Sequence, residues 1–293
     1  MARFSATGFR LALALGLVGT ACAAAPATES QPSVSLSSGN ASKNFREVSL
    51  SPTVSVALVW IPPGNFIRGS IESEPGRRPD EGPRTRVRIS QGFWLGRTPV
   101  TQREYKTVMG TNPSEFKAAG ENAPVESVSW EQAMEFCRRI NQRERDKQRL
   151  PPGYVYTLPT ESQWEYACRA GSTTIFYNGD QESDLAKAAW YKGNAAGTTH
   201  PVGQRQPNAW GLYDMLGNLW QWCYDWYGPY PAGDVVDPTG PATGRKRTNR
   251  GGSWDNFLGR CRCAARSPDA PDMLGNTALG FRLALAHDPS PKH

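Results

Sequence analysis

The chain has 293 residues, of which 38% are hydrophobic and 20% charged, with 29 Gly, 24 Pro and 10 Trp. This composition excludes collagen, a coiled coil and a wholly disordered chain. The 33 Lys and Arg against 27 Asp and Glu give a formal net charge of +6, without a single basic stripe. We therefore expect no nucleic-acid binding.

The first 25 residues have the pattern of an export signal. Arg3 and Arg10 precede the apolar run 11–18, and small residues follow, which predicts a signal peptide over residues 1–25. The apolar run is too short for a transmembrane span. Simple cleavage is the favoured route, and a lipid anchor at Cys22 is the alternative. We expect an exported protein, either periplasmic or secreted.

Residues 26–45 are rich in Ala, Ser, Pro and Thr, which predicts a flexible linker. Residues 46–287 carry most of the aromatic residues without a second linker-like interruption, so we expect one large domain there and a tail over 288–293. We expect the protein to be a monomer.

Three helices are predicted by capping boxes, in which a Ser or Thr is followed three positions later by Glu or Gln. The pairs are Thr101 with Glu104, Ser129 with Gln132, and Thr160 with Gln163. We expect the first helix to end near Met109, before Gly110, and the third at Gly171, a residue that favours a left-handed cap.

The second predicted helix has apolar residues at helical spacing, which should face the core. These residues are Trp130, Ala133, Met134, Cys137 and Ile140. Alternating runs over 57–61 and 85–89 predict strands. After Tyr177 the sequence is dominated by Gly, Pro, Asn and aromatic residues, so we expect a loop-rich second half held by Trp packing and covalent links.

Histidine chemistry is poorly supported. Of three histidines, His287 and His293 lie in the Pro-rich C-terminal stretch, so the domain cannot assemble a site from several imidazoles. The sequence has no P-loop, no Rossmann glycine motif and no G-x-S-x-G elbow. These absences exclude most common hydrolase and nucleotide chemistries.

Sulfur remains as the candidate reactive element. Five cysteines follow the signal: Cys137, Cys168, Cys223, Cys261 and Cys263. In an exported domain they are candidates for disulfides, and their odd number leaves at least one thiol unpaired within the chain. Arg260 and Arg262 flank Cys261 and are expected to stabilise a thiolate there. Structural disulfides with one buried thiol, and a reactive thiol, both remain open.

Several short motifs follow one another along the chain. They are Trp60-Ile61-Pro62-Pro63-Gly64, Pro99-Val100-Thr101, Val128-Ser129-Trp130, Leu158-Pro159-Thr160-Glu161, Trp164-Glu165-Tyr166-Ala167, Gly211-Leu212-Tyr213-Asp214-Met215-Leu216-Gly217-Asn218, Arg250-Gly251-Gly252-Ser253-Trp254 and Gly280-Phe281-Arg282. Together they resemble the formylglycine-generating enzyme, or sulfatase-modifying factor, family. The resemblance implies an α+β fold related to C-type lectins, loop-rich with a few short helices and small sheets.

The resemblance also implies a chemistry. Active members use oxygen and a copper(I) ion held by two cysteines to oxidise a cysteine in a Cys-x-Pro-x-Arg segment of a sulfatase to formylglycine. Soft thiolates suit copper(I). Here Asn256 stands in the place of the first active cysteine, and Cys261 falls in the place of the second. Ser253 and Trp222 match positions that line the family's active cavity.

The remaining cysteines are assigned by the same resemblance. Cys263 matches a structural cysteine whose partner matches Cys168, so we predict a Cys168–Cys263 disulfide. The family partner of the Cys137 position corresponds to Leu283, which predicts a buried free thiol at Cys137. Cys223 and Cys261 are left to form either a second disulfide, which we favour, or a two-sulfur copper site.

A calcium site is implied at Asn218, Leu219 and Gln221. The family has Glu where this chain has Gln221, and loss of that charge should weaken the site.

Three functions follow as expectations. The first is oxygen-dependent oxidation of an exported protein or peptide, with Cys261 as the reactive residue and Cys223 or Cys263 as the second ligand. The second is a noncatalytic, lectin-like module that binds an exported protein or glycan through a Trp-rich surface, although the tryptophans can equally form the core. The third is oxidative maturation of a periplasmic peptide natural product.

Overall fold

The computed structural model describes residues 44–290. The expected signal peptide (1–25), Cys22, nearly all of the expected linker (26–45) and the last three residues of the tail lie outside the described residues. No helix within 44–290 is long and apolar enough to cross a membrane.

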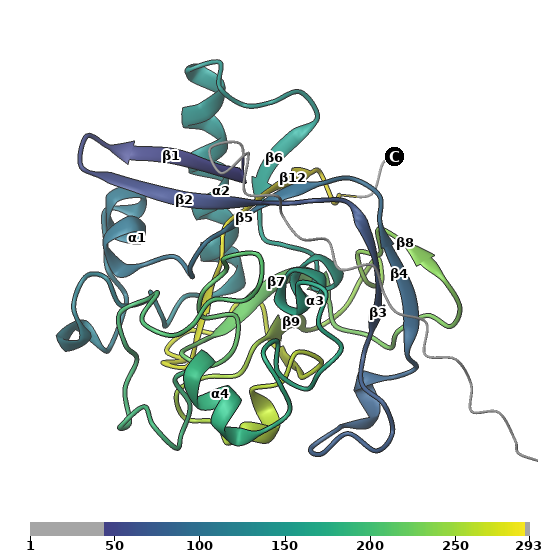
Figure 1. Cartoon of the computed structure of the whole chain (residues 1–293). Coiled ribbons are helices and arrows are strands. Elements are labelled where there is room, and N and C mark those ends of the chain that lie inside the picture. The colour runs from purple at the N-terminus through teal and green to yellow at the C-terminus, as the bar shows by residue number, and fades with distance from the viewer. Residues whose placement is uncertain (1–43, 291–293) are drawn as a thin grey trace, which may run out of the picture. The chain divides into compact units, whose positions relative to one another are not determined.

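Four α-helices and twelve strands are found in the described chain, mostly short (Figure 1). The helices are α1 (Gln102–Met109), α2 (Trp130–Asp146), α3 (Glu161–Arg169) and α4 (Glu182–Ala188). The strands are β1 (Phe45–Ser51), β2 (Val54–Ile61), β3 (Gly64–Arg68), β4 (Thr85–Ile89), β5 (Phe93–Gly96), β6 (Tyr154–Thr157), β7 (Trp220–Trp226), β8 (Val235–Val236), β9 (Arg247–Arg250), β10 (Arg266–Asp269), β11 (Leu279–Phe281) and β12 (Ala284–His287). Three 3-10 turns cover Pro79–Glu81, Lys117–Ala119 and Leu258–Arg260.

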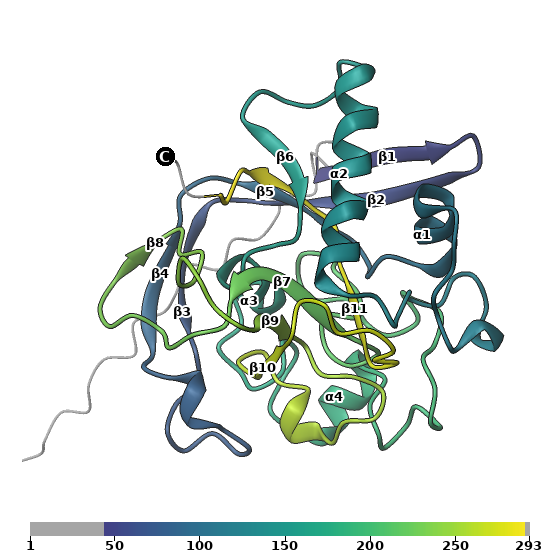
Figure 2. The same cartoon turned by 180° about the vertical axis from the view of Figure 1, so that it is seen from behind.

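An antiparallel five-stranded sheet in the order β1-β2-β5-β12-β6 separates two hydrophobic cores. Successive side chains of a strand point to opposite faces. Val59 and Ile61 of β2 therefore enter one core, while Val56 and Leu58 enter the other. Helices α1 and α2 pack in the second core, and α3 and α4 in the first. Figure 2 shows α2 standing beside β6, with which it is in contact.

The three predicted capping boxes are confirmed. Thr101, Ser129 and Thr160 each accept a hydrogen bond from the backbone N–H three residues later, and the Glu or Gln at that position bonds back. Helix α1 ends as predicted, with Gly110 in the left-handed conformation. The expected end of the third helix is wrong by one residue, because Ala170 takes the left-handed cap and Gly171 follows it, also with positive φ.

Both predicted strands are present: 85–89 is β4, with alternating burial, and 57–61 lies within β2. Of the expected core residues of α2, Ala133, Cys137 and Ile140 are buried, whereas Trp130 and Met134 are half-buried.

The second half of the domain is loop-rich but contains a four-stranded sheet in the order β10-β9-β7-β11. Buried arginines donate hydrogen bonds to carbonyl groups of loops and turns. Arg250 donates to the carbonyls of residues 263, 264 and 265, and Arg266 donates to those of Asp80 and Gly228. These guanidinium groups are paired with buried carboxylates, among them Glu161 and Glu165. The fold is mixed α and β, as predicted.

Candidate functional site

The loop that carries Ser253 and Cys261 begins at two glycines with positive φ, 105° at Gly251 and 75° at Gly252. A Cβ on Gly251 would lie 2.8 Å from the carbonyl oxygen of Met215. A Cβ on Gly252 would lie 2.6 Å from the Cys261 sulfur. Only glycine fits at either position, so this pair brings the two ends of the loop together.

Ser253 and Cys261 are adjacent, and both are fully buried. The Cys261 thiol faces the carbonyl oxygen of Ser253 at 3.9 Å, while the Ser253 hydroxyl donates to Asp255 Oδ1 at 2.6 Å. Burial raises the pKa of the Cys261 thiol to about 12, against the opposing effect of Arg260 and Arg262. The expected thiolate at Cys261 is therefore wrong, because desolvation outweighs the two flanking charges.

Arg262 has its own partners. It donates to Glu74 at 2.6 Å and to Glu81 at 2.8 Å, and its second terminal nitrogen donates to the carbonyl of Gly76 at 2.7 Å. The guanidinium thus links the 70–82 loop to the loop between Ser253 and Cys261. These hydrogen bonds go to Glu74, Glu81 and Gly76 and not to the Cys261 sulfur.

Trp222 and Cys223 lie on β7, where successive side chains point in opposite directions. The Trp222 indole N–H donates to the carbonyl of Val128 at 2.9 Å, and the Cys223 sulfur faces the carbonyl of Gln221 at 3.9 Å. Both side chains are fully buried, and burial raises the pKa of the Cys223 thiol well above its usual range. Cys223 and Cys261 share one core cluster but face carbonyls of different segments.

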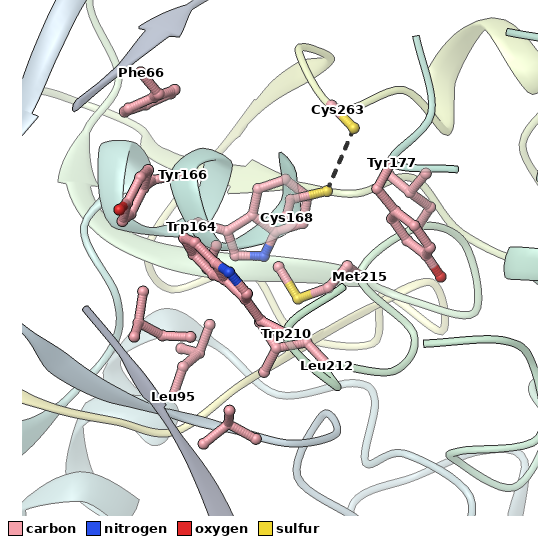
Figure 3. Close-up of a cluster of buried hydrophobic side chains, with 14 of the residues drawn as sticks. Phe66, Leu95, Trp164, Tyr166, Cys168, Tyr177, Trp210, Leu212, Met215 and Cys263 are labelled. Carbon is pink, nitrogen blue, oxygen red and sulfur yellow. Dashed lines mark hydrogen bonds between the residues drawn. The ribbon is translucent and has the colours of Figure 1, made fainter. Parts of the chain in front are cut away.

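The other predicted pair is brought together. The Cys168 and Cys263 sulfurs lie 3.6 Å apart in the buried cluster that Figure 3 shows, with Trp164 and Tyr177 around them. Both are thiols in this structure, as are the other described cysteines, so their disulfide stays a prediction. Cys137 is buried in the same core as Leu283, and its state as a free thiol likewise stays a prediction.

The residues of the implied calcium site form a hydrogen-bonded network instead of an open set of oxygens. Gln221 accepts from Trp164 and Arg282 through Oε1 and donates to the Asp214 carbonyl through Nε2. Asn218 accepts through Oδ1 from the His200 backbone N–H. The side-chain oxygens of this set are thus occupied by N–H donors, which does not fit a cation that needs six or more oxygen ligands.

The residues that sequence analysis missed here are Asp214 and Arg282. Each is fully buried, and each stands inside a motif that carried the family resemblance. Within residues 44–290, no group of three or more His, Cys, Asp or Glu side chains is placed to hold a metal ion.

The loop between Ser253 and Cys261 exposes two apolar side chains. Phe257 is 68% exposed and Leu258 is 37% exposed. The Lys192 ammonium lies 4.4 Å from the Phe257 ring centroid, and the Lys192 backbone N–H donates to the Asn256 carbonyl at 2.9 Å. We call Phe257, Leu258 and Lys192 the loop surface. Such a surface cannot be predicted from the sequence, because the sequence does not show whether an apolar residue is exposed or buried.

The tryptophans form no exposed surface. All ten fall within residues 44–290, where four are buried and six are half-buried. This burial favours the alternative in which the tryptophans form the core, since seven of the ten lie on helices or strands.

Comparison with known proteins places this geometry in a family. The profile described as "Sulfatase-modifying factor enzyme 1-like domain" matches residues 44–287. The chain is 36% identical over 180 residues to the formylglycine-generating enzyme of Streptomyces coelicolor, covering 56% of this chain and 52% of that one. It is 32% identical over 206 residues to the chaperone protein LppX of Paenibacillus barcinonensis, covering 55% of this chain and 69% of that one.

A solved structure, variable protein 1 of Treponema denticola, superposes with a TM-score of 0.72 at 28% identity, covering 83% of this chain and 99% of that one. The chain spans about half the length of the formylglycine-generating enzymes it matches, 52% in Streptomyces coelicolor. The profile match and the similarity of fold together show that this chain belongs to the sulfatase-modifying factor family, alongside the formylglycine-generating enzymes.

Proposed function

We propose that this domain recognises a segment of an exported protein or peptide through the loop surface, without copper-dependent oxidation of it. The main support for the proposal is that one of the two cysteines needed to hold copper(I) is missing. Asn256 stands where the family resemblance places the first copper thiolate, and an amide does not replace a thiolate for copper(I).

The thiol left at the second position, Cys261, is also poorly suited to the oxidation. It is fully buried and, with a pKa of about 12, protonated at neutral pH. A copper(I) ion held there needs a second converging sulfur. The other buried thiols have different neighbours: Cys223 faces the Gln221 carbonyl, and Cys263 contacts Cys168.

The loop surface supports recognition. Phe257 and Leu258 are held by a rigid base, because the loop between Ser253 and Cys261 is closed by Gly252 and tied down by Arg262. Two adjacent exposed apolar side chains, with an ammonium over one ring, suit an extended chain that offers apolar and acidic groups. The relative named a chaperone protein, matched over 69% of its length, also favours action on a polypeptide.

The proposal is tested by binding of the purified protein to an array of peptides that scans exported proteins. The Phe257→Ser/Leu258→Ser double variant should lose most of the wild-type signal, because these side chains supply the apolar contact. Val236→Ser, which alters another exposed apolar residue, 59% exposed on β8, is the matched control and should bind like wild type.

Thermal unfolding of all three proteins confirms that they are folded, since exposed substitutions change stability little. Wild-type binding that survives the double substitution would refute recognition by the loop surface, as would the absence of any wild-type binding.

A further inference from the structure

We propose that the side-chain amide of Gln221, held in place by hydrogen bonds from Trp164 and Arg282, takes the place of a calcium ion in organising the loop before β7, so that the domain folds independently of calcium. This proposal does not rest on the proposed function. It concerns the position where the family resemblance implies calcium at Asn218, Leu219 and Gln221.

Gln221 is fully buried and uses both ends of its carboxamide. Its Oε1 accepts from Trp164 Nε1 at 2.9 Å and from Arg282 Nε at 3.0 Å. Its Nε2 donates to the Asp214 carbonyl at 2.7 Å. The two donors can only face an oxygen and the carbonyl can only face an N–H, so the network fixes the orientation of the amide.

Arg282 supplies the positive charge at this position. Its terminal nitrogens donate to the carbonyls of Gly96 at 2.6 Å, Tyr213 at 2.7 Å and Asp214 at 3.1 Å. The buried Asp214 carboxylate, which accepts from Asn218 Nδ2, balances this guanidinium charge. A divalent cation bound here would add charge to a pair that is already balanced and would meet the N–H groups bonded to the oxygens.

The polar groups of Asn218 are also satisfied by hydrogen bonds within the protein. Asn218, with φ of 59°, accepts from the His200 backbone N–H at 3.1 Å and donates to the His200 carbonyl at 3.0 Å. Its own backbone N–H donates to the Trp190 carbonyl at 2.7 Å. The Asn218 side chain thus bonds both backbone polar groups of His200 and holds the two loops together without an ion.

The network reaches the candidate site. The Gly217 backbone N–H donates to the Gly251 carbonyl at 2.9 Å, and the Trp254 backbone N–H donates to the Asn218 carbonyl at 3.0 Å. The loop before β7 therefore supports both sides of Ser253, and its order does not depend on an ion.

Glutamate at position 221 would behave differently. Its carboxylate could still accept from Trp164 and Arg282, but its second oxygen would face the Asp214 carbonyl oxygen where Nε2 now donates. Two oxygens at that spacing repel unless a cation lies between them. Gln221 thus suits a site in which hydrogen bonds hold the oxygens together, whereas Glu suits a site in which a cation does so.

The test measures thermal unfolding of the full chain in EDTA and in millimolar calcium chloride. Wild type should show melting temperatures within about 1 °C of each other, whereas a site of micromolar affinity would raise the melting temperature by about 8 °C or more. Gln221→Glu should melt lower than wild type in EDTA and recover at least part of the loss in calcium.

Gln132→Glu is the matched control, since Glu serves equally well in the capping box of α2, and it should not respond to calcium. Because Gln221→Glu can fail to fold, calcium bound to wild type is also measured by elemental analysis after dialysis against calcium. Stoichiometric calcium in wild type, or a wild-type melting temperature that falls in EDTA, overturns the proposal. A Gln221→Glu protein that folds and is indifferent to calcium also overturns it.

Discussion

Breaking the predicted Cys168–Cys263 disulfide should lower the stability of the domain by several kcal/mol. The two sulfurs lie 3.6 Å apart and come from positions 95 residues apart in sequence. Oxidation of the pair, with loss of two protons and two electrons, would need them to approach to about 2.05 Å. Closing a loop of this length in the unfolded chain is worth about 4.7 kcal/mol in the chain-entropy account.

That free energy corresponds to a fall of roughly 10 to 20 °C in melting temperature for a domain of this size. The assay is thermal unfolding of protein purified from an oxidising compartment, with and without reductant. The Cys168→Ala/Cys263→Ala variant is the control, and its melting temperature should not respond to reductant. Peptide mapping without reduction that recovers both residues as free thiols, or equal melting temperatures of wild type in both buffers, would show that the disulfide does not form or does not stabilise the domain.

Three further substitutions should change stability. Burial first, and the nearby Glu161 second, raise the pKa of Asp225 from 3.8 to about 7, so the folded chain binds more protons than the unfolded chain between these values and loses stability as pH rises through them. Asp225→Asn should remove this loss, and chemical denaturation should show a gain in stability that is larger at pH 8 than at pH 5 by up to about 2.5 kcal/mol; an equal gain at both pH values would contradict the raised pKa. Glu165→Gln removes the nearer carboxylate of the fully buried Arg250, which is also the partner of Arg169, and should cost about 3 to 5 kcal/mol in urea unfolding; a cost under about 1 kcal/mol would show that these pairs are unimportant. Ser129→Ala removes the cap of α2 and should cost about 1 kcal/mol by the same measurement, with no loss contradicting the capping geometry.

Local signals in the sequence were sufficient where the structure is local. The capping boxes of α1, α2 and α3 predict helix starts because donor and acceptor lie three residues apart. Helix α4 was not predicted, since its cap is Gln181, which is not among the residues that favour that position. Strand β7 was not predicted either, because five of its seven residues are buried and no alternation is visible.

The candidate site depends on contacts between distant residues, which a single sequence does not show. Gln221 bonds Trp164 and Arg282, which are 57 and 61 residues away. From the sequence alone, the exchange of Glu for Gln therefore predicts only a weakened calcium site. The structure adds that Trp164 and Arg282 donate to the Gln221 side chain. Cys261 was expected to be a thiolate for a similar reason: the flanking charges are visible in the sequence, whereas the burial that raises its pKa is not.

We propose that the domain does not carry out copper-dependent oxidation of a cysteine. The most direct test incubates the purified protein with copper(I), oxygen, a thiol reductant and a Cys-x-Pro-x-Arg peptide, and measures the aldehyde product by mass spectrometry. The arrangement of Asn256 and the buried Cys261 predicts no aldehyde above a protein-free control. Aldehyde that forms with wild type and disappears with Cys261→Ala would show that the domain carries out this oxidation through Cys261.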